Sequence, residues 1–162
     1  MKKTALALAS AMLLLTACGT DSTTGANAGG AGAGSGAPGT GSGVLGMDAQ
    51  GNNVGDRVFF ALDSSVVDSE GQGTLDRQAT WLKANPNVNI TLEGHADERG
   101  TREYNIALGE RRATAAKSYL VGQGVAANRI STVSYGKERP AVTGNDESAW
   151  SQNRRAVTVI AN

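Results

Sequence analysis

Residues 94–112 of this chain, GHADERGTREYNIALGERR, place a carboxylate and a guanidinium where one helix could direct them at the same point. Asn105, Leu108 and Arg112 follow one another at spacings of three and four residues, so they share one face of a helix. Asp97 lies in the loop before that helix. Since a carboxylate attracts an ammonium and a guanidinium fork matches a carboxylate, the pattern favours a zwitterionic ligand with a free amine and a free carboxylate.

Asp97 and Arg112 also admit a plainer interpretation. An Asp in a loop usually forms a turn or a cap, and an Arg on a helix is usually solvated. Asp97 could therefore serve only as a turn residue, or pair with Arg112. Gly100 and Thr101 open the helix, whose free backbone N–H groups favour a negative ligand group. If the site binds a ligand, we expect Asp97 and Arg112 to face a solvent-filled pocket rather than the core.

His95 is the only histidine of the chain, which bears on catalysis and on metal binding. A catalytic triad needs a nucleophile, a base and a third group, and no such motif surrounds any serine. A metal site needs more than one His or Cys. We therefore expect a structural role for His95, no catalytic residue, no metal site and no cofactor.

The N-terminus has the pattern of an export signal. Lys2 and Lys3 precede an apolar run over residues 4–15, which ends shortly before Cys18. The run is too short to span a bilayer, and its flanks are typical of a secretory signal. Small residues before a Cys at this place resemble the bacterial lipobox. That resemblance implies a signal peptide over residues 1–17, cleavage before Cys18 and lipidation of its thiol and its new amino group.

Cys18 is the only cysteine, so it cannot form an intramolecular disulfide. The alternative is an ordinary signal peptide that happens to contain a Cys. Two or more acyl chains give stable anchoring to a membrane. Gly19 follows the Cys, where lipoproteins kept in the inner membrane commonly have Asp, so the outer membrane is favoured.

Residues 18–55 are dominated by small and polar residues, and residues 29–43 are nearly pure low complexity. Such a segment buries too little surface to offset its ordering entropy, which predicts a disordered, Gly-rich linker after Cys18. It could be a leash from the lipid to a distant target, or a spacer without a required length.

Residues 56–162 are long enough for one domain with one core. The chain has 15 Lys and Arg against 15 Asp and Glu, a formal net charge of zero. Without a basic excess, nothing in the composition points to nucleic acid or to an anionic membrane surface.

Strand and helix patterns alternate along this domain. Apolar alternation and branched residues predict strands, and helical spacing between turn signals predicts helices. The expected strands are 57–62, 88–92, 130–135 and 156–160, and the expected helices are 69–84, about 102–121 and a turn at 150–154. Strand–helix–strand crossovers in series predict an α+β fold, a two-layer α/β sandwich of βαβαβ type with a mixed sheet and helices on one face.

Several long motifs resemble the OmpA C-terminal domain family, whose fold is this sandwich. They lie at residues 58–60, 62–63, 93–101, 104–120, 134–138 and 153–157, and so cover nearly the whole domain. Ala61 departs from the family pattern, which more usually has Asp or Gly after the aromatic pair. The resemblance implies non-covalent binding of the peptidoglycan stem peptide through diaminopimelate, whose free end is an amine and a carboxylate.

The resemblance also assigns roles by position. Asp97 matches the carboxylate that meets the ammonium, and Arg112 matches the arginine that grips the carboxylate. Asn105 and Leu108 match the supporting helix face. The resemblance further implies that Leu62 and Asp63 border the pocket and that Asn153 and Arg154 buttress it.

Together these features predict an outer-membrane lipoprotein on the periplasmic face, which tethers that membrane to the cell wall within the Tol system and supports envelope integrity and cell division. The resemblance implies the periplasmic protein TolB as a partner. One alternative is a peptidoglycan hydrolase or amidase, which the lone His95 disfavours. Another is a different cell-wall anchor of the same family, such as a porin or stator domain.

Overall fold

A computed structural model describes residues 44–47 and 51–161 of the chain. The expected signal peptide, Cys18 and most of the expected linker lie outside the described residues. Within the described part, no helix is both long enough and apolar enough to cross a membrane.

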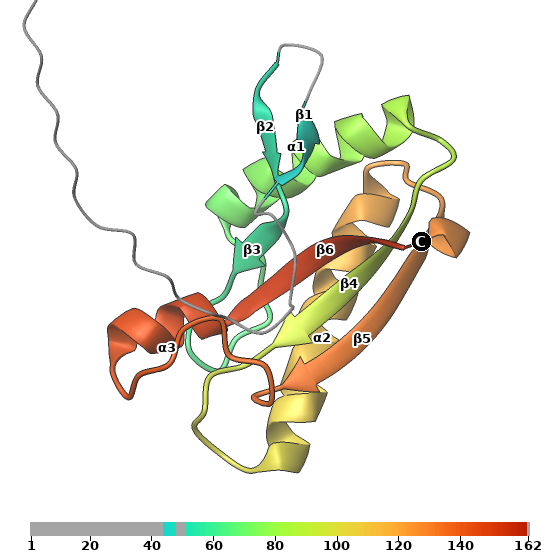
Figure 1. The fold of residues 1–162 in the computed structure, drawn as a ribbon. Coiled ribbons are helices and arrows are strands. Elements are labelled where there is room, and N and C mark those ends of the chain that lie inside the picture. Colours follow the sequence, from blue (N-terminus) through green and yellow to red (C-terminus); the bar gives the residue numbers. More distant parts are fainter. Residues whose placement is uncertain (1–43, 48–50, 162) are drawn as a thin grey trace, which may run out of the picture. The chain divides into compact units, whose positions relative to one another are not determined.

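The main element is a sheet of four strands in the order β3-β6-β4-β5 (Figure 1). These are β3 (Arg57–Phe59), β4 (Asn89–His95), β5 (Ile130–Gly136) and β6 (Arg155–Ala161). β4 pairs with β5 in parallel, while β6 runs antiparallel to both β3 and β4. β4 is therefore an inner strand, and the loop that follows it begins between the ends of its neighbours.

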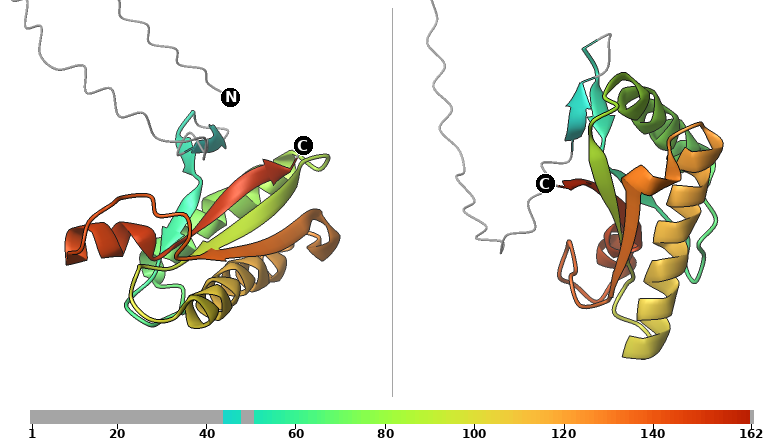
Figure 2. Two further views of the ribbon diagram at one scale, coloured as in Figure 1. Left: turned by 60° about the horizontal axis from the view of Figure 1, so that its bottom comes forward. Right: turned by 90° about the vertical axis from the view of Figure 1, so that its right-hand side faces the viewer.

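Helices α1 (Ser69–Ala84) and α2 (Arg102–Gly122) cover one face of this sheet, as Figure 2 shows edge-on. Each begins at a side-chain cap. The Asp68 carboxylate accepts from the backbone of Gly71, and the Thr101 hydroxyl accepts from that of Tyr104. The predicted fold class, an α+β two-layer sandwich with a mixed sheet, is confirmed.

The core lies between the helices and the sheet. Its members are apolar residues, most of them small or branched, namely Val58, Phe60, Leu75, Ala79, Leu82, Ile90, Leu92, Ala113, Ala116, Leu120, Val125, Ile130 and Ala156. α2 lies very close to the sheet at Gly109, where a Cβ added to Gly94 of β4 would collide with the Gly109 carbonyl. Two facing glycines therefore set the depth at which α2 lies on β4.

The prediction of a linker through residue 55 is wrong for its last part. β1 (Val44–Met47) and β2 (Asn53–Gly55) pair as a two-stranded antiparallel sheet. The physical reason is apolar burial, since Leu45 and Val54 are buried although the surrounding composition is rich in Gly and Asn. The folded part thus begins before residue 56.

The first strand of the main sheet is shorter than the expected 57–62. β3 ends at Phe59, and the chain then turns, with Ser64 donating to the Ala61 carbonyl and Asp63 at a positive φ of 53°. The turn residues direct their carbonyls at α2 instead of continuing the sheet. The expected turn at 150–154 is a longer helix, α3 (Glu147–Asn153). Its N-cap is Asp146, so the helix begins three residues before the expected start at Trp150. A short 3₁₀ helix (Ala127–Arg129) precedes β5.

Candidate functional site

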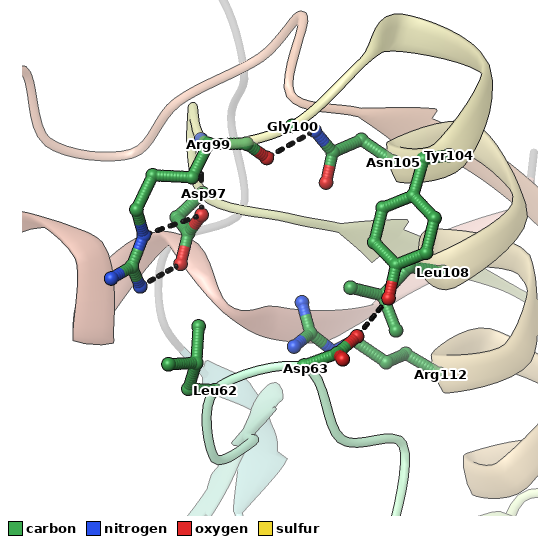
Figure 3. A pocket seen from close by; sticks show the side chains of 9 residues that line it. All are labelled: Leu62, Asp63, Asp97, Arg99, Gly100, Tyr104, Asn105, Leu108 and Arg112. Carbon is green, nitrogen blue, oxygen red and sulfur yellow. Dashed lines mark hydrogen bonds and ion pairs between the residues drawn. The ribbon is translucent and has the colours of Figure 1, made fainter.

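A pocket of about 250 Å³ opens beyond the end of β4, beside the first turns of α2 (Figure 3). Six of the eight residues expected at the binding site line it. Its full lining is Leu62, Asp63, Asp97, Arg99, Gly100, Tyr104, Asn105, Leu108 and Arg112. Three separate segments contribute, namely the turn after β3, the loop after β4 and one face of α2.

Asp97 is 6% exposed and is held by two arginines. One oxygen, Oδ2, accepts from Arg99 Nη2 at 2.6 Å and from Arg154 Nη1 at 3.5 Å. The other, Oδ1, accepts from the Arg99 backbone N–H at 3.2 Å and from Arg99 Nε at 3.3 Å. Burial by itself would raise the pKa of the Asp97 carboxyl, but the Arg99 and Arg154 bonds outweigh burial and the pKa is lowered. Asp97 is therefore ionised at neutral pH.

These contacts test the plainer interpretation of Asp97, namely that it is only a turn residue or that it pairs with Arg112. Asp97 does form a short turn, since it accepts from the backbone of the residue two positions on. The cations that meet it are Arg99 and Arg154, however, and not the expected alternative Arg112.

Arg112 is fully buried at 0% exposure, so the expectation that it would face solvent is wrong. Its guanidinium donates to three backbone carbonyls, those of Ser64 at 2.8 Å, His95 at 2.8 Å and Ala61 at 3.2 Å. The reason is tertiary, because the turn after β3 folds over this side chain and the end of β4 lies beneath it. Arg112 thus fastens three segments of the pocket wall together.

Desolvation by burial lowers the pKa of Arg112 to about 10, and the nearby charge of Asp97 partly opposes it. Arg112 therefore stays charged at neutral pH. Among the described residues, none places a carboxylate within ion-pair distance of its guanidinium. A guanidinium has five N–H donors. Each of the three Arg112 nitrogens donates one hydrogen bond to a backbone carbonyl. Two donors remain on a cation that lines the pocket.

The other predicted residues on the pocket have distinct positions. The Asn105 side chain is buried and donates to the Arg99 carbonyl at 2.8 Å, so it holds the loop while it lines the cavity. Leu108 is buried, whereas Leu62 at 59% exposure stands at the rim. Asp63 accepts a hydrogen bond from the hydroxyl of Tyr104 across the mouth.

Asn153 and Arg154 do not line the pocket. Asn153 accepts from the backbone of Ala141 and Val142 and so orders the loop before α3. Arg154 donates to the Phe60 carbonyl at 3.0 Å, to Asp97 and to Glu147. This second arginine joins the turn after β3, the loop after β4 and α3 from behind, which is a buttressing arrangement.

Sequence reasoning missed Arg99 and Tyr104 as pocket residues. The position of Arg99 gave a usable signal, because an arginine two residues after a loop aspartate can fold back onto it. The contact between Tyr104 and Asp63 joins residues 41 positions apart and has no local signal.

His95 ends β4 and is buried at 1% exposure, with its ring 5.6 Å from that of Tyr135. Neither ring nitrogen has a hydrogen-bond partner among the described residues. Desolvation, followed by the charges of Arg155 and Arg139, lowers the pKa of His95 to about 3. The ring is therefore neutral at physiological pH, and His95 is not among the residues that line the pocket.

Within the described ranges, no group of three or more His, Cys, Asp or Glu side chains is arranged to hold a metal ion. The pocket offers fixed charges and hydrogen-bond donors.

Comparison with known proteins identifies the family of this chain. The sequence profile of the OmpA family matches residues 59–154, a stretch that includes every pocket residue and both buttressing residues. The chain belongs to the OmpA family. Its pocket is formed entirely within the segment that the OmpA family shares.

Curated relatives carry the name peptidoglycan-associated lipoprotein. The one from Rhizobium meliloti (strain 1021) is 63% identical over 108 residues, which is 67% of this chain and 61% of the relative. That from Haemophilus influenzae (strain ATCC 51907 / DSM 11121 / KW20 / Rd) is 54% identical over 100 residues, 62% of this chain and 65% of the relative. The matches thus span less than two thirds of these relatives' length.

Solved structures show the same fold. The crystal structure of the peptidoglycan-associated lipoprotein from Burkholderia pseudomallei has a TM-score of 0.64 and 43% identity, covering 65% of this chain and 90% of that one. The C-terminal domain of Helicobacter pylori MotB has a TM-score of 0.61 at 21% identity, covering 66% and 84%. The second likeness concerns the OmpA-family fold alone.

Proposed function

We propose that this OmpA-family protein binds peptidoglycan without cleaving it, by holding the free amino-acid end of diaminopimelate in the pocket beside α2. The relatives' name, peptidoglycan-associated lipoprotein, supports the class of ligand. The chemistry of the pocket supports the particular group, a zwitterion with one ammonium and one carboxylate.

The observation that carries the proposal is the buried cation Arg112. A charge taken out of water is costly unless it is paired, and the described residues supply carbonyls but no carboxylate to Arg112. A ligand carboxylate would meet its two remaining donors and complete the pair. Because folding has already buried and oriented the Arg112 guanidinium, its remaining donors form a preorganised binding site for an anion.

The ammonium of the same ligand finds its partner on the opposite wall. Asp97 is ionised and lines the same cavity, so the two ends of an α-amino acid meet opposite charges within one pocket. Leu108 and the rim residue Leu62 offer apolar surface to the methylene stem of the ligand. The roles of Asn153 and Arg154 are to hold these walls in place.

The remaining parts of the proposal rest on the sequence outside the described residues. Lipidation of Cys18 would anchor the protein in the outer membrane, with the pocket in the periplasm. Tethering the wall to that membrane would place the protein in the Tol–Pal system, with TolB as a partner and a role in envelope integrity and cell division. The domain boundaries of this proposal are a signal peptide at 1–17, a lipidated linker and a folded part that begins near residue 44.

A pulldown with purified sacculi tests the proposal. The wild-type chain is expected to sediment with sacculi, and free diaminopimelate is expected to release it. Asp97→Asn removes one partner of a desolvated charge pair, which costs about 2–5 kcal/mol, so binding should weaken roughly 30-fold or more.

Glu103→Gln is the matched control, because Glu103 is an exposed carboxylate of α2 outside the pocket. It should bind sacculi as the wild type does. Equal sedimentation of Asp97→Asn and wild type would place the binding site elsewhere. Release of soluble wall fragments during the same incubation would favour the alternative of a hydrolase.

A further inference from the structure

Arg99 fills the anionic side of the pocket. Its guanidinium lies along both oxygens of Asp97, at 2.6 Å from Nη2 to Oδ2 and 3.3 Å from Nε to Oδ1 (Figure 3). This is the side-on, two-bond geometry in which guanidinium and carboxylate interact most strongly. The group that a ligand ammonium needs is therefore already occupied by a cation of the protein itself.

The two cations on Asp97 differ in their freedom to leave. Arg154 has a side chain only 7% exposed and is also bonded to the Phe60 carbonyl and Glu147. The Arg99 side chain is 35% exposed. An ammonium arriving at Asp97 would place three cations around one carboxylate, and repulsion then favours departure of the exposed one.

A second position for Arg99 lies close by on α3. Its guanidinium carbon is 4.0 Å from the centre of the Trp150 ring, and its Nη2 is 4.0 Å from Glu147 Oε2. Glu147 is 64% exposed on its side chain, so it can accept a second guanidinium. A rotation of the Arg99 side chain over the face of Trp150 would exchange one carboxylate for another while keeping the stacking contact.

The backbone of the loop is fixed, so only the side chain has to move. Asn105 holds the Arg99 carbonyl at 2.8 Å, and Lys137 holds the next carbonyl, that of Gly100, at 2.7 Å. Ala96 donates to the Gly136 carbonyl at 2.8 Å on the other side of Asp97. The aspartate therefore stays in place when its exposed partner leaves.

We propose that Arg99 determines the charge specificity of the pocket, by occupying Asp97 until a ligand ammonium displaces it towards Glu147 across the face of Trp150. This rests on the proposed function, because it assigns the ammonium to Asp97. Two consequences follow. A ligand whose amine is acetylated cannot displace Arg99, and removal of the Arg99 charge relieves the competition that every ammonium ligand must overcome.

The experiment uses the purified full chain in detergent and a soluble stem peptide with a free diaminopimelate end, with its N-acetylated form at that amine as the second ligand. Calorimetry gives affinity and tryptophan fluorescence reports on Trp150, with Trp150→Phe assigning the signal. Arg99→Gln is expected to bind the free-amine peptide about tenfold more tightly, because one competing ion pair is lost. Arg102→Gln is the matched control, as Arg102 is an exposed arginine of α2 that pairs with Glu138.

The free-amine peptide should change Trp150 fluorescence in the wild type, and the acetylated peptide should not. Glu147→Gln should weaken wild-type binding about threefold and have no effect in the Arg99→Gln background, since the two residues act in one step. If wild type binds and Asp97→Asn does not, yet Arg99→Gln binds no more tightly than Arg102→Gln, Arg99 is not the competitor. Unchanged Trp150 fluorescence at saturation with the free-amine peptide would refute the proposed displacement of the Arg99 side chain. Failure of wild type to bind the free-amine peptide would instead overturn the proposed function.

Discussion

Replacement of Arg112 with methionine tests its role in the fold, as distinct from its proposed role towards a ligand. Methionine keeps much of the length and the apolar stem of the side chain, but it removes every donor and the charge. The carbonyls of Ala61, Ser64 and His95 then lose the guanidinium that joins them. The pocket wall is held at these three points, so the substitution should loosen the fold as well as the site.

Two opposing free energies decide the size of the effect. A buried carbonyl without a donor costs about 1–3 kcal/mol, so three of them cost on the order of 6 kcal/mol. The substitution also removes a charge whose burial lowers the pKa of Arg112 to about 10, and this shift corresponds to about 3 kcal/mol of desolvation that the substitution relieves. We expect Arg112→Met to lower the free energy of unfolding by about 3 kcal/mol.

Urea unfolding followed by far-UV circular dichroism measures this difference. The midpoint should fall while the dependence on urea stays the same, because the surface exposed on unfolding hardly changes. Arg111→Met is the matched control, since Arg111 is the neighbouring exposed arginine on the same helix. Its effect should lie within about 0.5 kcal/mol of zero.

Equal midpoints for Arg112→Met and Arg111→Met would refute this reasoning. The three carbonyls would then be satisfied without the guanidinium, and Arg112 would act on the ligand alone. That was the expectation from the sequence, which placed this side chain in a solvent-facing pocket where its loss would hardly affect folding.

Three further predictions concern packing, pH and anchoring. Gly94→Ala should destabilise the fold by about 3 kcal/mol in urea unfolding, because the added methyl meets the Gly109 carbonyl, while Gly122→Ala, which meets nothing, should not destabilise it. The folded pKa of His95 is about 3 against 6.5 ordinarily, so the unfolded chain binds the extra proton between these values and stability falls as pH falls. From about pH 7 to about pH 5 the loss should be about 2 kcal/mol, and His95→Gln should remove this pH dependence, whereas an equal slope in both proteins would contradict it. Cys18→Ser should release the protein from the outer-membrane fraction, and retention after a high-salt wash would rule out lipid anchoring.

Local patterns predicted the elements of this fold well because their causes are local. The helix at 69–84 was predicted with its observed bounds, since Asp68 caps its start and the turn signal after Ala84 ends it. The order of strands and helices limited the topology to a sandwich with a mixed sheet, because a crossover between parallel strands needs an intervening helix. The pocket residues on α2 were also predictable, because helical spacing alone places them on one face.

Other features have causes that lie far along the chain. The strand at 44–47 forms in a segment whose composition predicts disorder, because Leu45 and Val54 are buried in the fold. β3 ends early because the residues after Phe59 turn their carbonyls towards a helix more than 40 positions away. Neither effect can be read from a window of neighbouring residues.

The sequence by itself placed two charges at the pocket, since Asp97 before a helix and Arg112 on its face are fixed by spacing. Only the tertiary structure decided what each charge does. Helical periodicity states which residues share a face but not how deeply that face is covered, so the complete burial of Arg112 came from the turn folded over it. Pairing follows distance in space, and folding brought Asp97 to Arg99 and to Arg154, 57 positions away, while the Arg112 guanidinium donates to backbone carbonyls.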